Sequence, residues 1–202
     1  MTFEQLVENA RAHQARIPVA QRRRLAAGQS PVALFITCSD SRVVPTLITG
    51  AAPGQLFELR TAGNIVPPYQ EDRPSSEIAT IEFAVEELGV SDVVVCGHSH
   101  CGAVAARQRI DQMDRLPAVR DWLRLTTGRP GAPVAESDPA VREAARRHLA
   151  EQLATLADYP FVRSRVERGD LRLHGWFYEL DTGVVWSCPP GAEPAEPALQ
   201  PL

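Results

Sequence analysis

At 202 residues, with 44% hydrophobic and 23% charged residues, the chain fits one globular domain with a substantial core. Its formal net charge of −4 at pH 7 provides no overall positive field for nucleic acid or for an anionic membrane surface. Residues 1–27 lack the apolar core of a signal peptide, and no stretch approaches the ~20 apolar residues that span a bilayer. We therefore expect a cytoplasmic protein that binds neither nucleic acid nor membranes.

Apolar runs and turn residues predict helices and strands in alternation along the first half of the chain. Ser75 and Ser76 can each cap the N-terminus of a helix, and Gly89 ends that helix before the next strand. In order, the predicted elements are a helical arm over 3–27 broken near Pro18, strands over 32–37, 56–60 and 91–96, and helices over 45–49, 75–88 and from Gly102. Because strand, helix and strand follow one another, this half predicts a parallel crossover.

The second half predicts three more helices and a closing pair of strands. Asp138 and Pro139 are typical of the cap and the first turn of a helix. The predicted helices cover 117–126, 139–157 and 160–167, and the predicted strands cover 171–180 and 184–186. Residues 189–202 are rich in Pro, Ala and Glu and are expected to form a flexible tail. The pattern predicts one α/β domain over 1–188, with a mainly parallel central sheet flanked by helices and a helical arm at its start.

Two short polar motifs directly follow predicted buried strands. Cys38-Ser39-Asp40-Ser41-Arg42 comes after the first strand, and His98-Ser99-His100-Cys101-Gly102 comes after the strand at 91–96. Ligands collect in the crevice outside the carboxyl ends of parallel strands, so the two motifs can meet there. Cys38, His98 and Cys101 would supply two sulfurs and one imidazole, a ligand set that zinc favours. Because a structural zinc site takes four protein ligands, three ligands leave one position for water or a carboxylate, which indicates catalysis.

Asp40 and Arg42 are expected beside this metal. If the chain stays extended past Cys38, residues 38, 40 and 42 face the same side, because side chains alternate along a strand. Arg42 would keep the Asp40 carboxylate ionised and turned off the metal, so that Asp40 could accept a hydrogen bond from hydroxide on the zinc. Gly97 and Gly102 flank the second motif, where they allow a tight turn and leave backbone donors at a helix start.

The other cysteines and histidines receive structural interpretations. Cys96 should point away from Cys101 into packing, and Cys188 adjoins the Pro-rich tail. His100 is either a surface residue or a proton carrier, and the surface interpretation is favoured. The remaining histidines, which have no motif around them, are His13, His148 and His174.

The motifs resemble those of β-class carbonic anhydrases. The matching runs are Cys38-Ser39-Asp40-Ser41-Arg42, Arg60-Thr61-Ala62-Gly63-Asn64 and Gly97-His98-Ser99-His100-Cys101-Gly102, and the similarity extends over about residues 29–186. Pro117-Ala118-Val119, Trp122-Leu123 and His174-Gly175-Trp176 are most similar to the plant-type and bacterial cyanate-operon branch. The resemblance implies a zinc lyase that reversibly hydrates CO2 to bicarbonate and a proton by metal-bound hydroxide, in a homodimer or larger homo-oligomer.

The resemblance also implies residue roles. One zinc per subunit would be held by Cys38, His98 and Cys101, and Asp40 would pair with Arg42. In some members of the family the matching aspartate moves onto zinc as a fourth ligand and closes the site. The residues that match substrate-pocket positions, partly across a dimer interface, are Gln29, Phe57, Phe83 and the N–H of Gly102. Phe83 stands where the family commonly has tyrosine, so a hydroxyl contact is missing at that point.

Three alternatives can be weighed from the sequence. A cysteine phosphatase is excluded, because Ser39-Asp40-Ser41 is too short a run between Cys38 and Arg42 for a phosphate loop, and Asp40 would repel a phosphate. A zinc hydrolase on the same scaffold that acts on carbon disulfide would be expected to carry extensions that control access to the site, and none is evident. A non-catalytic zinc or bicarbonate-binding module would not need the additional carboxylate and arginine.

Overall fold

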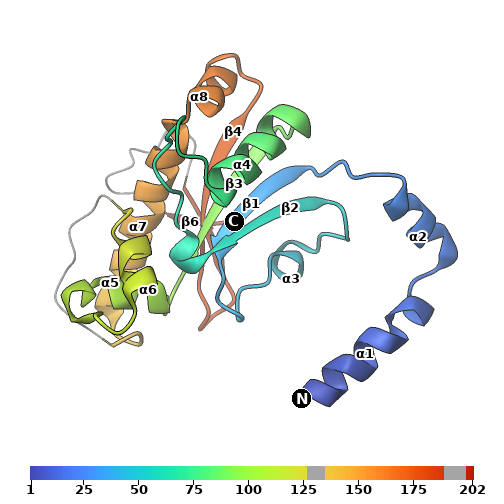
Figure 1. Cartoon of the computed structure of the whole chain (residues 1–202), viewed down its shortest axis with the longest axis horizontal. Coiled ribbons are helices and arrows are strands. Elements are labelled where there is room, and N and C mark those ends of the chain that lie inside the picture. The colour runs from blue at the N-terminus through green and yellow to red at the C-terminus, as the bar shows by residue number, and fades with distance from the viewer. Residues whose placement is uncertain (127–134, 189–198) are drawn as a thin grey trace.

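The computed structural model describes residues 1–126, 135–188 and 199–202. Among these residues, a six-stranded sheet has the order β2-β1-β3-β4-β5-β6 (Figure 1). Its strands are β1 (Ala33–Cys38), β2 (Leu56–Thr61), β3 (Asp92–His98), β4 (Arg172–Tyr178), β5 (Val185–Ser187) and β6 (Gln200–Pro201). The first four pair in parallel, whereas β5 and β6 add antiparallel pairs at one edge. The predicted mainly parallel sheet is therefore confirmed.

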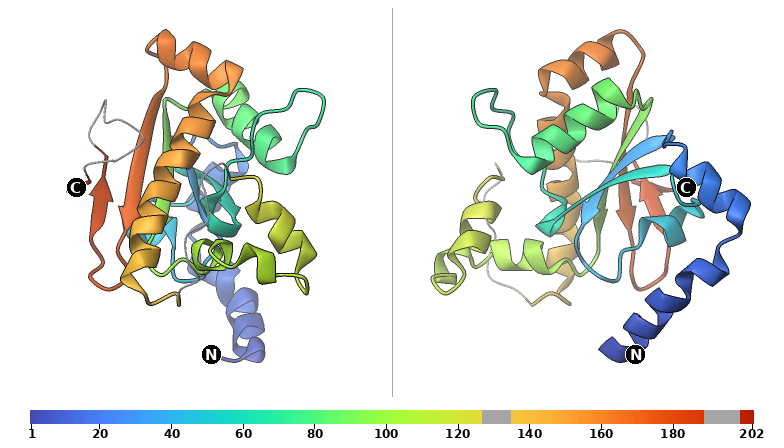
Figure 2. Two further views of the ribbon diagram at one scale, coloured as in Figure 1. Left: turned by 90° about the vertical axis from the view of Figure 1, so that its left-hand side faces the viewer. Right: turned by 45° about the vertical axis from the view of Figure 1, so that its right-hand side comes forward.

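Helices cover one face of the sheet (Figure 2). The longest of those described, α7 (Pro139–Ala157), packs on β3 and β4. The packing is close at Gly97, where a Cβ atom would lie in van der Waals contact, 3.5 Å from both Leu149 of α7 and Phe177 of β4. The other elements outside the arm are α3 (Pro45–Thr49), the 3-10 turn η1 (Ala62–Asn64), α4 (Ser76–Glu82) with its π-helical continuation η2 (Phe83–Glu87), α5 (Gly102–Arg107), the 3-10 turn η3 (Ile110–Gln112), α6 (Pro117–Leu123) and α8 (Pro160–Glu167).

The opposite face of the sheet carries a second, smaller apolar cluster. Phe35 pairs with Val94 in the strand register, and both side chains are buried together with Cys96. Trp176 and Tyr178 of β4 pack beside them and are only partly buried. A cavity of about 430 Å³ lies over this face, lined in part by Phe35, Val94 and Trp176. This face is therefore largely apolar, and residues 1–126, 135–188 and 199–202 cover it incompletely.

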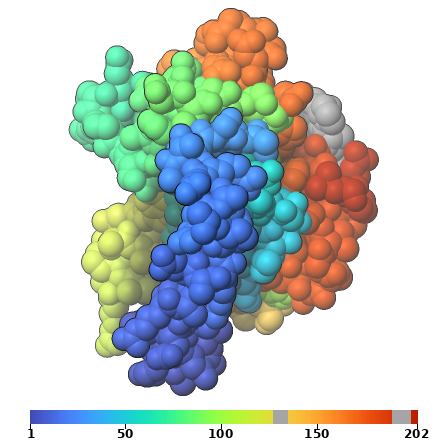
Figure 3. Space-filling model, turned by 90° about the vertical axis from the view of Figure 1, so that its right-hand side faces the viewer, coloured from blue at the N-terminus to red at the C-terminus, as the bar shows by residue number. Residues whose placement is uncertain are grey.

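The N-terminal arm consists of α1 (Phe3–Arg16) and α2 (Val19–Ala26), neither of which buries a residue. Thr2 and Gln5 form a capping box that starts α1. In Figure 1 the arm extends away from the sheet, and in Figure 3 it runs across the face toward the viewer and past the rest of the molecule. Phe3, Leu6 and Val19 each expose more than half of their surface. The apolar side chains of the arm thus find little cover among the residues that the structure describes.

The predicted helices and strands all occur, with small differences at their ends. The predicted helix over 75–88 changes from α to π geometry at Phe83. Residues 189–198 of the predicted flexible tail lie outside the described residues, whereas Gln200 and Pro201 pair with Ser187 and Trp186 as an edge strand. In the described part of the chain, no helix combines the length and apolar character needed to cross a bilayer.

Candidate metal centre

The three predicted ligand side chains meet at the carboxyl ends of β1 and β3. Cys38 is the last residue of β1 and His98 the last of β3, and these strands are neighbours in the sheet. The chain then turns at His100, which has a φ of 55°, and returns Cys101 to the same place. The ligand atoms of Cys38, His98 and Cys101 all lie within 4.8 Å of one another, and all three residues are buried.

The orientation of the His98 ring fits a metal ligand. Its Nδ1 lies 2.8 Å from the carbonyl oxygen of Ser99. Because a carbonyl oxygen can only accept, Nδ1 carries the hydrogen and Nε2 is left with a lone pair. Nε2 is fully buried and has no hydrogen-bond partner among the described residues. A buried acceptor without a donor is costly, and a cation between it and the two sulfurs would remove that cost.

The surroundings of the two sulfurs also suit a cation. Cys38 Sγ accepts hydrogen bonds from the N–H of Asp40 at 3.4 Å and of Gly63 at 3.3 Å. The Cys101 thiol donates toward Cys38, which lowers the pKa of Cys38, whereas the pKa of Cys101 is raised by the same contact and by burial. A divalent cation held between the two sulfurs would stabilise both as thiolates. Two thiolates and one imidazole fit zinc, which binds sulfur and nitrogen in tetrahedral sites.

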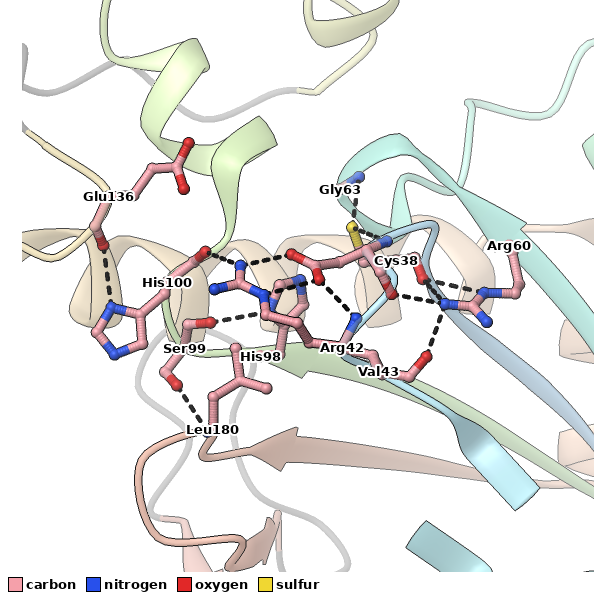
Figure 4. A network of polar contacts seen from close by, with 11 residues as sticks. Cys38, Arg42, Val43, Arg60, Gly63, His98, Ser99, His100, Glu136 and Leu180 are labelled. Atoms are coloured by element: carbon pink, nitrogen blue, oxygen red, sulfur yellow. Dashed lines mark hydrogen bonds and ion pairs between the residues drawn. The ribbon is translucent and has the colours of Figure 1, made fainter. Parts of the chain in front are cut away.

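Asp40 and Arg42 form a two-point ion pair. Figure 4 shows Arg42 between the loop that carries Cys38 and the backbone of His100. Arg42 Nε donates to Asp40 Oδ1 at 2.9 Å and Nη2 donates to Oδ2 at 2.6 Å. The expectation of an extended chain past Cys38 is wrong, since β1 ends there and Val43 N donates to the Asp40 carbonyl in a turn. Asp40 and Arg42 still meet, because Asp40 Oδ1 also accepts from the backbone N–H of Arg42 at 2.9 Å, as in an Asx turn.

The ion pair sets the charge of Asp40. Hydrogen bonds from Arg42 lower the pKa of the Asp40 carboxyl group to about 2. The carboxylate is therefore ionised throughout the neutral range. Arg42 is held in turn by the carbonyl oxygen of His100, which accepts from Nη2 at 3.0 Å. The side chain of Arg42 in the first motif is thus bonded to the backbone of the second motif.

Arg60 of β2 holds the loop that carries Asp40. Its guanidinium donates to the carbonyl of Cys38 at 3.2 and 2.9 Å, to that of Asp40 at 2.8 Å and to that of Val43 at 2.7 Å. These bonds satisfy backbone carbonyls that the turn removes from the sheet ladder. The third motif of the sequence, which begins at Arg60, therefore shapes the metal centre from the neighbouring strand.

Comparison with known proteins agrees with this geometry. A family model described as "Carbonic anhydrase" matches residues 33–185. The chain is 47% identical over 167 residues to a carbonic anhydrase of Pseudomonas aeruginosa, a match that covers 81% of this chain and 76% of that one. It is 41% identical over 168 residues to a carbonic anhydrase of Synechocystis, covering 80% of this chain and 61% of that one. A solved structure of the β-carbonic anhydrase CcaA superimposes with a TM-score of 0.81 at 35% identity, covering 91% of this chain and 86% of that chain.

The chain belongs to the β-carbonic anhydrase family. The predicted family, zinc cofactor and zinc-dependent hydration of CO2 are confirmed with it. This chain spans less than two thirds of the length of the Synechocystis relative. It covers 76% of the length of the Pseudomonas relative.

Within this β-carbonic anhydrase chain, the four residues predicted to line the substrate pocket do not gather at one place. Gly102 follows Cys101 directly at the start of α5. Phe57 pairs in the sheet with Leu34, four residues before Cys38, and its ring lies 6.0 Å from that of Phe83. Gln29 precedes β1 and lines a cavity of about 580 Å³ with Gly54 and Gln55. Only Gly102 therefore adjoins the metal centre of its own chain.

Two acidic residues at the rim of the centre were not identified from the sequence. A Cβ atom on Gly102 would lie 3.0 Å from Oε1 of Glu136, so this carboxylate closely covers the start of α5. Asp181 Oδ2 lies 2.7 Å from His100 Nε2, and Nδ1 of the same ring is 3.3 Å from the Glu136 carbonyl. Both acidic residues are remote from the motifs in sequence, and no local pattern marks them. His100 thus links two loops at the rim, which extends the predicted surface role.

Proposed function

We propose that Cys38, His98 and Cys101 hold the catalytic zinc and that Asp40 is the catalytic acceptor beside it, kept in place by Arg42. When bound, zinc supplies the Lewis acidity that activates a water molecule as the nucleophile. The observation that carries the role of Asp40 is its two-point pairing with Arg42. Both carboxylate oxygens are engaged there, so neither would be free to act as a further ligand when zinc is bound.

The chain's own residues then orient the reaction. Ionised Asp40 can accept one hydrogen bond from the attacking water, which directs a lone pair of that water toward CO2. Arg42 preserves the charge of Asp40, because its hydrogen bonds lower the pKa of the carboxyl group to about 2. We propose that the N–H of Gly102, which follows Cys101 at the start of α5, donates to an oxygen of the forming bicarbonate. Each of these roles is one of positioning and proton acceptance.

We infer that Gln29, Phe57 and Phe83 line the substrate pocket of a second subunit. Phe57 pairs with Leu34 near the start of β1, Phe83 lies beside Phe57, and Gln29 precedes β1, so these residues lie away from the ends of β1 and β3. Phe57 and Phe83 would provide an apolar wall that suits CO2, and Gln29 an amide that can bond to an oxygen. Phe83 contributes no hydroxyl to that wall.

A homodimer or larger homo-oligomer follows from the same arrangement. The exposed apolar residues of the arm and the incompletely covered sheet face around Phe35 and Trp176 are complementary in character. A related β-carbonic anhydrase of Sordaria macrospora, 27% identical with a TM-score of 0.65, is described as tetrameric. We propose that the arm of one copy packs on another copy. A protein with reduced ligand cysteines suits the cytoplasm, where we place it.

Removing the arm is expected to weaken this assembly. The full chain should elute in light scattering as a dimer or a multiple of it, whereas a chain beginning at Gly28 should dissociate toward monomers as it is diluted. Its secondary structure should remain, because no residue of α1 or α2 is buried in the body. A shortened chain with the same mass as the full chain at every concentration would contradict the proposed role of the arm.

Stopped-flow hydration of CO2 by the zinc-loaded protein tests the proposed open site. Because Asp40 is ionised and paired with Arg42 well below pH 7, we expect activity at both pH 7 and pH 8.5. The rate should disappear when zinc is removed and return when it is restored. Activity at pH 8.5 alone would indicate that Asp40 leaves Arg42 and closes the metal at neutral pH.

Two other functions give different results in the same assay. Zinc-dependent turnover of carbon disulfide without CO2 hydration would indicate the sister hydrolase. Bound zinc with no zinc-dependent rate on either substrate would indicate a non-catalytic binding module. The ion pair of Asp40 with Arg42 favours the enzyme, because a metal that only joins two loops needs neither charge.

A further inference from the structure

The loop that follows β2 is held by side chains from several distant elements. This loop, residues 62–67, contains the turn η1 and approaches the metal centre through Gly63. Side chains bond to four of its backbone carbonyls: Trp122 Nε1 to that of Ala62 at 2.9 Å, His148 Nε2 to that of Gly63 at 2.7 Å, Thr61 Oγ1 to that of Ile65 at 3.0 Å and Tyr159 Oη to that of Pro67 at 2.6 Å. In addition, the backbone N–H of Val66 donates to Gln152 Oε1 at 2.9 Å. A loop without regular pairing is thereby kept in one conformation.

Gly63 is the point where this loop acts on the metal centre. Its N–H donates to Cys38 Sγ at 3.3 Å. The φ of Gly63 is 74°, and a Cβ atom there would lie 3.0 Å from that of Ala103, so no larger residue fits without movement. The hydrogen bond to sulfur therefore depends on the orientation of the peptide group between Ala62 and Gly63, and the peptide group that follows Gly63 helps to hold that orientation.

Trp122 of α6 and His148 of α7 each hold one of these peptide groups. The Ala62 carbonyl, which accepts from Trp122, belongs to the same planar peptide as the N–H that points at Cys38. The Gly63 carbonyl, which accepts from His148, belongs to the next peptide. The hydrogen bonds from Trp122 and His148 therefore hold the peptide groups on both sides of Gly63.

His148 is well suited to this task. The residue is 2% exposed, and burial lowers its pKa, so the ring is neutral. Nε2 must carry the hydrogen because the Gly63 carbonyl can only accept, and Nδ1 then faces the side-chain amide of Gln152 at 3.5 Å. Buried hydrogen bonds of this kind keep a single ring orientation.

We propose that Trp122 and His148 are positioning residues of the zinc centre, acting through the Gly63 N–H on the sulfur of Cys38. An N–H bond withdraws electron density from a thiolate, and partners of this kind tune both the affinity and the electronic character of a metal site. The inference rests on the proposed metal ligands. It assigns a function to a histidine that has no motif in the sequence and to an indole on a different helix.

Three substitutions distinguish an effect on the metal centre from a general loss of loop stability. Trp122→Phe keeps an aromatic ring but removes the N–H donor. His148→Leu fills the space of the imidazole with an apolar side chain that has no donor. His148→Gln retains an amide donor that can reach the Gly63 carbonyl. The matched control is Tyr159→Phe, which removes a hydrogen bond that is buried like that of His148, at Pro67, the far end of the same loop.

Two measurements on each variant read the metal centre without using activity. The first is the rate at which a chelator removes zinc from the loaded protein. The second is the sulfur-to-cobalt charge-transfer band after zinc is exchanged for Co(II). We expect Trp122→Phe and His148→Leu to lose zinc about 10-fold faster or more and to shift the band to lower energy, since the sulfur gains electron density. His148→Gln should resemble the unaltered chain, and Tyr159→Phe should lower thermal stability alone.

The outcomes distinguish this inference from the proposed metal site. A band in the unaltered chain that neither donorless variant changes, with zinc release also unchanged, would overturn the positioning role. An equal change in Tyr159→Phe would overturn it too, because the effect would then belong to the loop as a whole. Absence of any charge-transfer band in the unaltered chain would overturn the metal site itself. Should His148→Leu not fold, His148→Met fills the space flexibly without a strong donor, and Trp122→Phe stands independently.

Discussion

Replacing Cys101 with alanine is expected to abolish both zinc binding and CO2 hydration. Three buried donor atoms converge within 4.8 Å in the described chain, and this substitution leaves only one sulfur and one imidazole. Three protein ligands are the usual minimum for a catalytic zinc site. The zinc content of the purified variant, measured per subunit, should fall close to zero, and stopped-flow hydration should fall to the rate without protein. One zinc per subunit in Cys101→Ala would contradict the proposed ligand set.

Cys96→Ala is the matched control for that experiment. Cys96 is also buried and lies five residues earlier in the chain, but it packs on the opposite face of the sheet with Phe35 and Val94. Burial raises its pKa to about 12, so the thiol is neutral and acts as a small apolar side chain. Its removal should cost stability on the order of 1 kcal/mol through lost packing, while zinc content and hydration rate stay unchanged.

Asp40→Asn is expected to retain zinc and to lose most of its activity. The amide can keep one hydrogen bond to Arg42, so the loop that Arg60 holds should survive. The amide lacks the negative charge, however, and can present a donor where the reaction needs an acceptor. We expect the turnover number to fall by about 100-fold or more, within the range for removal of a positioned proton acceptor. Stopped-flow rates and zinc content are to be measured on the same preparation.

Asp181→Asn provides the comparison for the loss of charge. Asp181 is exposed at the same rim and pairs with His100, so its substitution removes one negative charge near the centre without touching Arg42. Its hydration rate should remain near that of the unaltered chain. Full activity of Asp40→Asn with bound zinc would exclude Asp40 as the catalytic acceptor. A comparable loss in both variants would attribute the effect to the overall field instead.

Local sequence patterns were sufficient to predict most of the elements. Apolar runs bounded by Gly and Pro marked β1, β2 and β3, and the Asp138-Pro139 pair marked the start of α7, where the Asp138 side chain accepts from Ala140 N at 2.8 Å. Extrapolating strand alternation past Cys38 failed, because the Asp40 side chain bonds to the N–H of Arg42 and turns the chain instead.

The sequence by itself determined the ligand types, their places at two strand ends and the pairing of Asp40 with Arg42. These features depend on residue identity and on short spacings, which a single chain displays directly. Only the tertiary structure decided which remote side chains support them. Trp122 and His148 bond to the loop beside the centre, and Glu136 lies at its rim, because α6, α7 and the segment before α7 pack there; long-range packing of this kind leaves no local pattern in the sequence. These contacts form only in the folded chain, because they join residues that are far apart in the sequence.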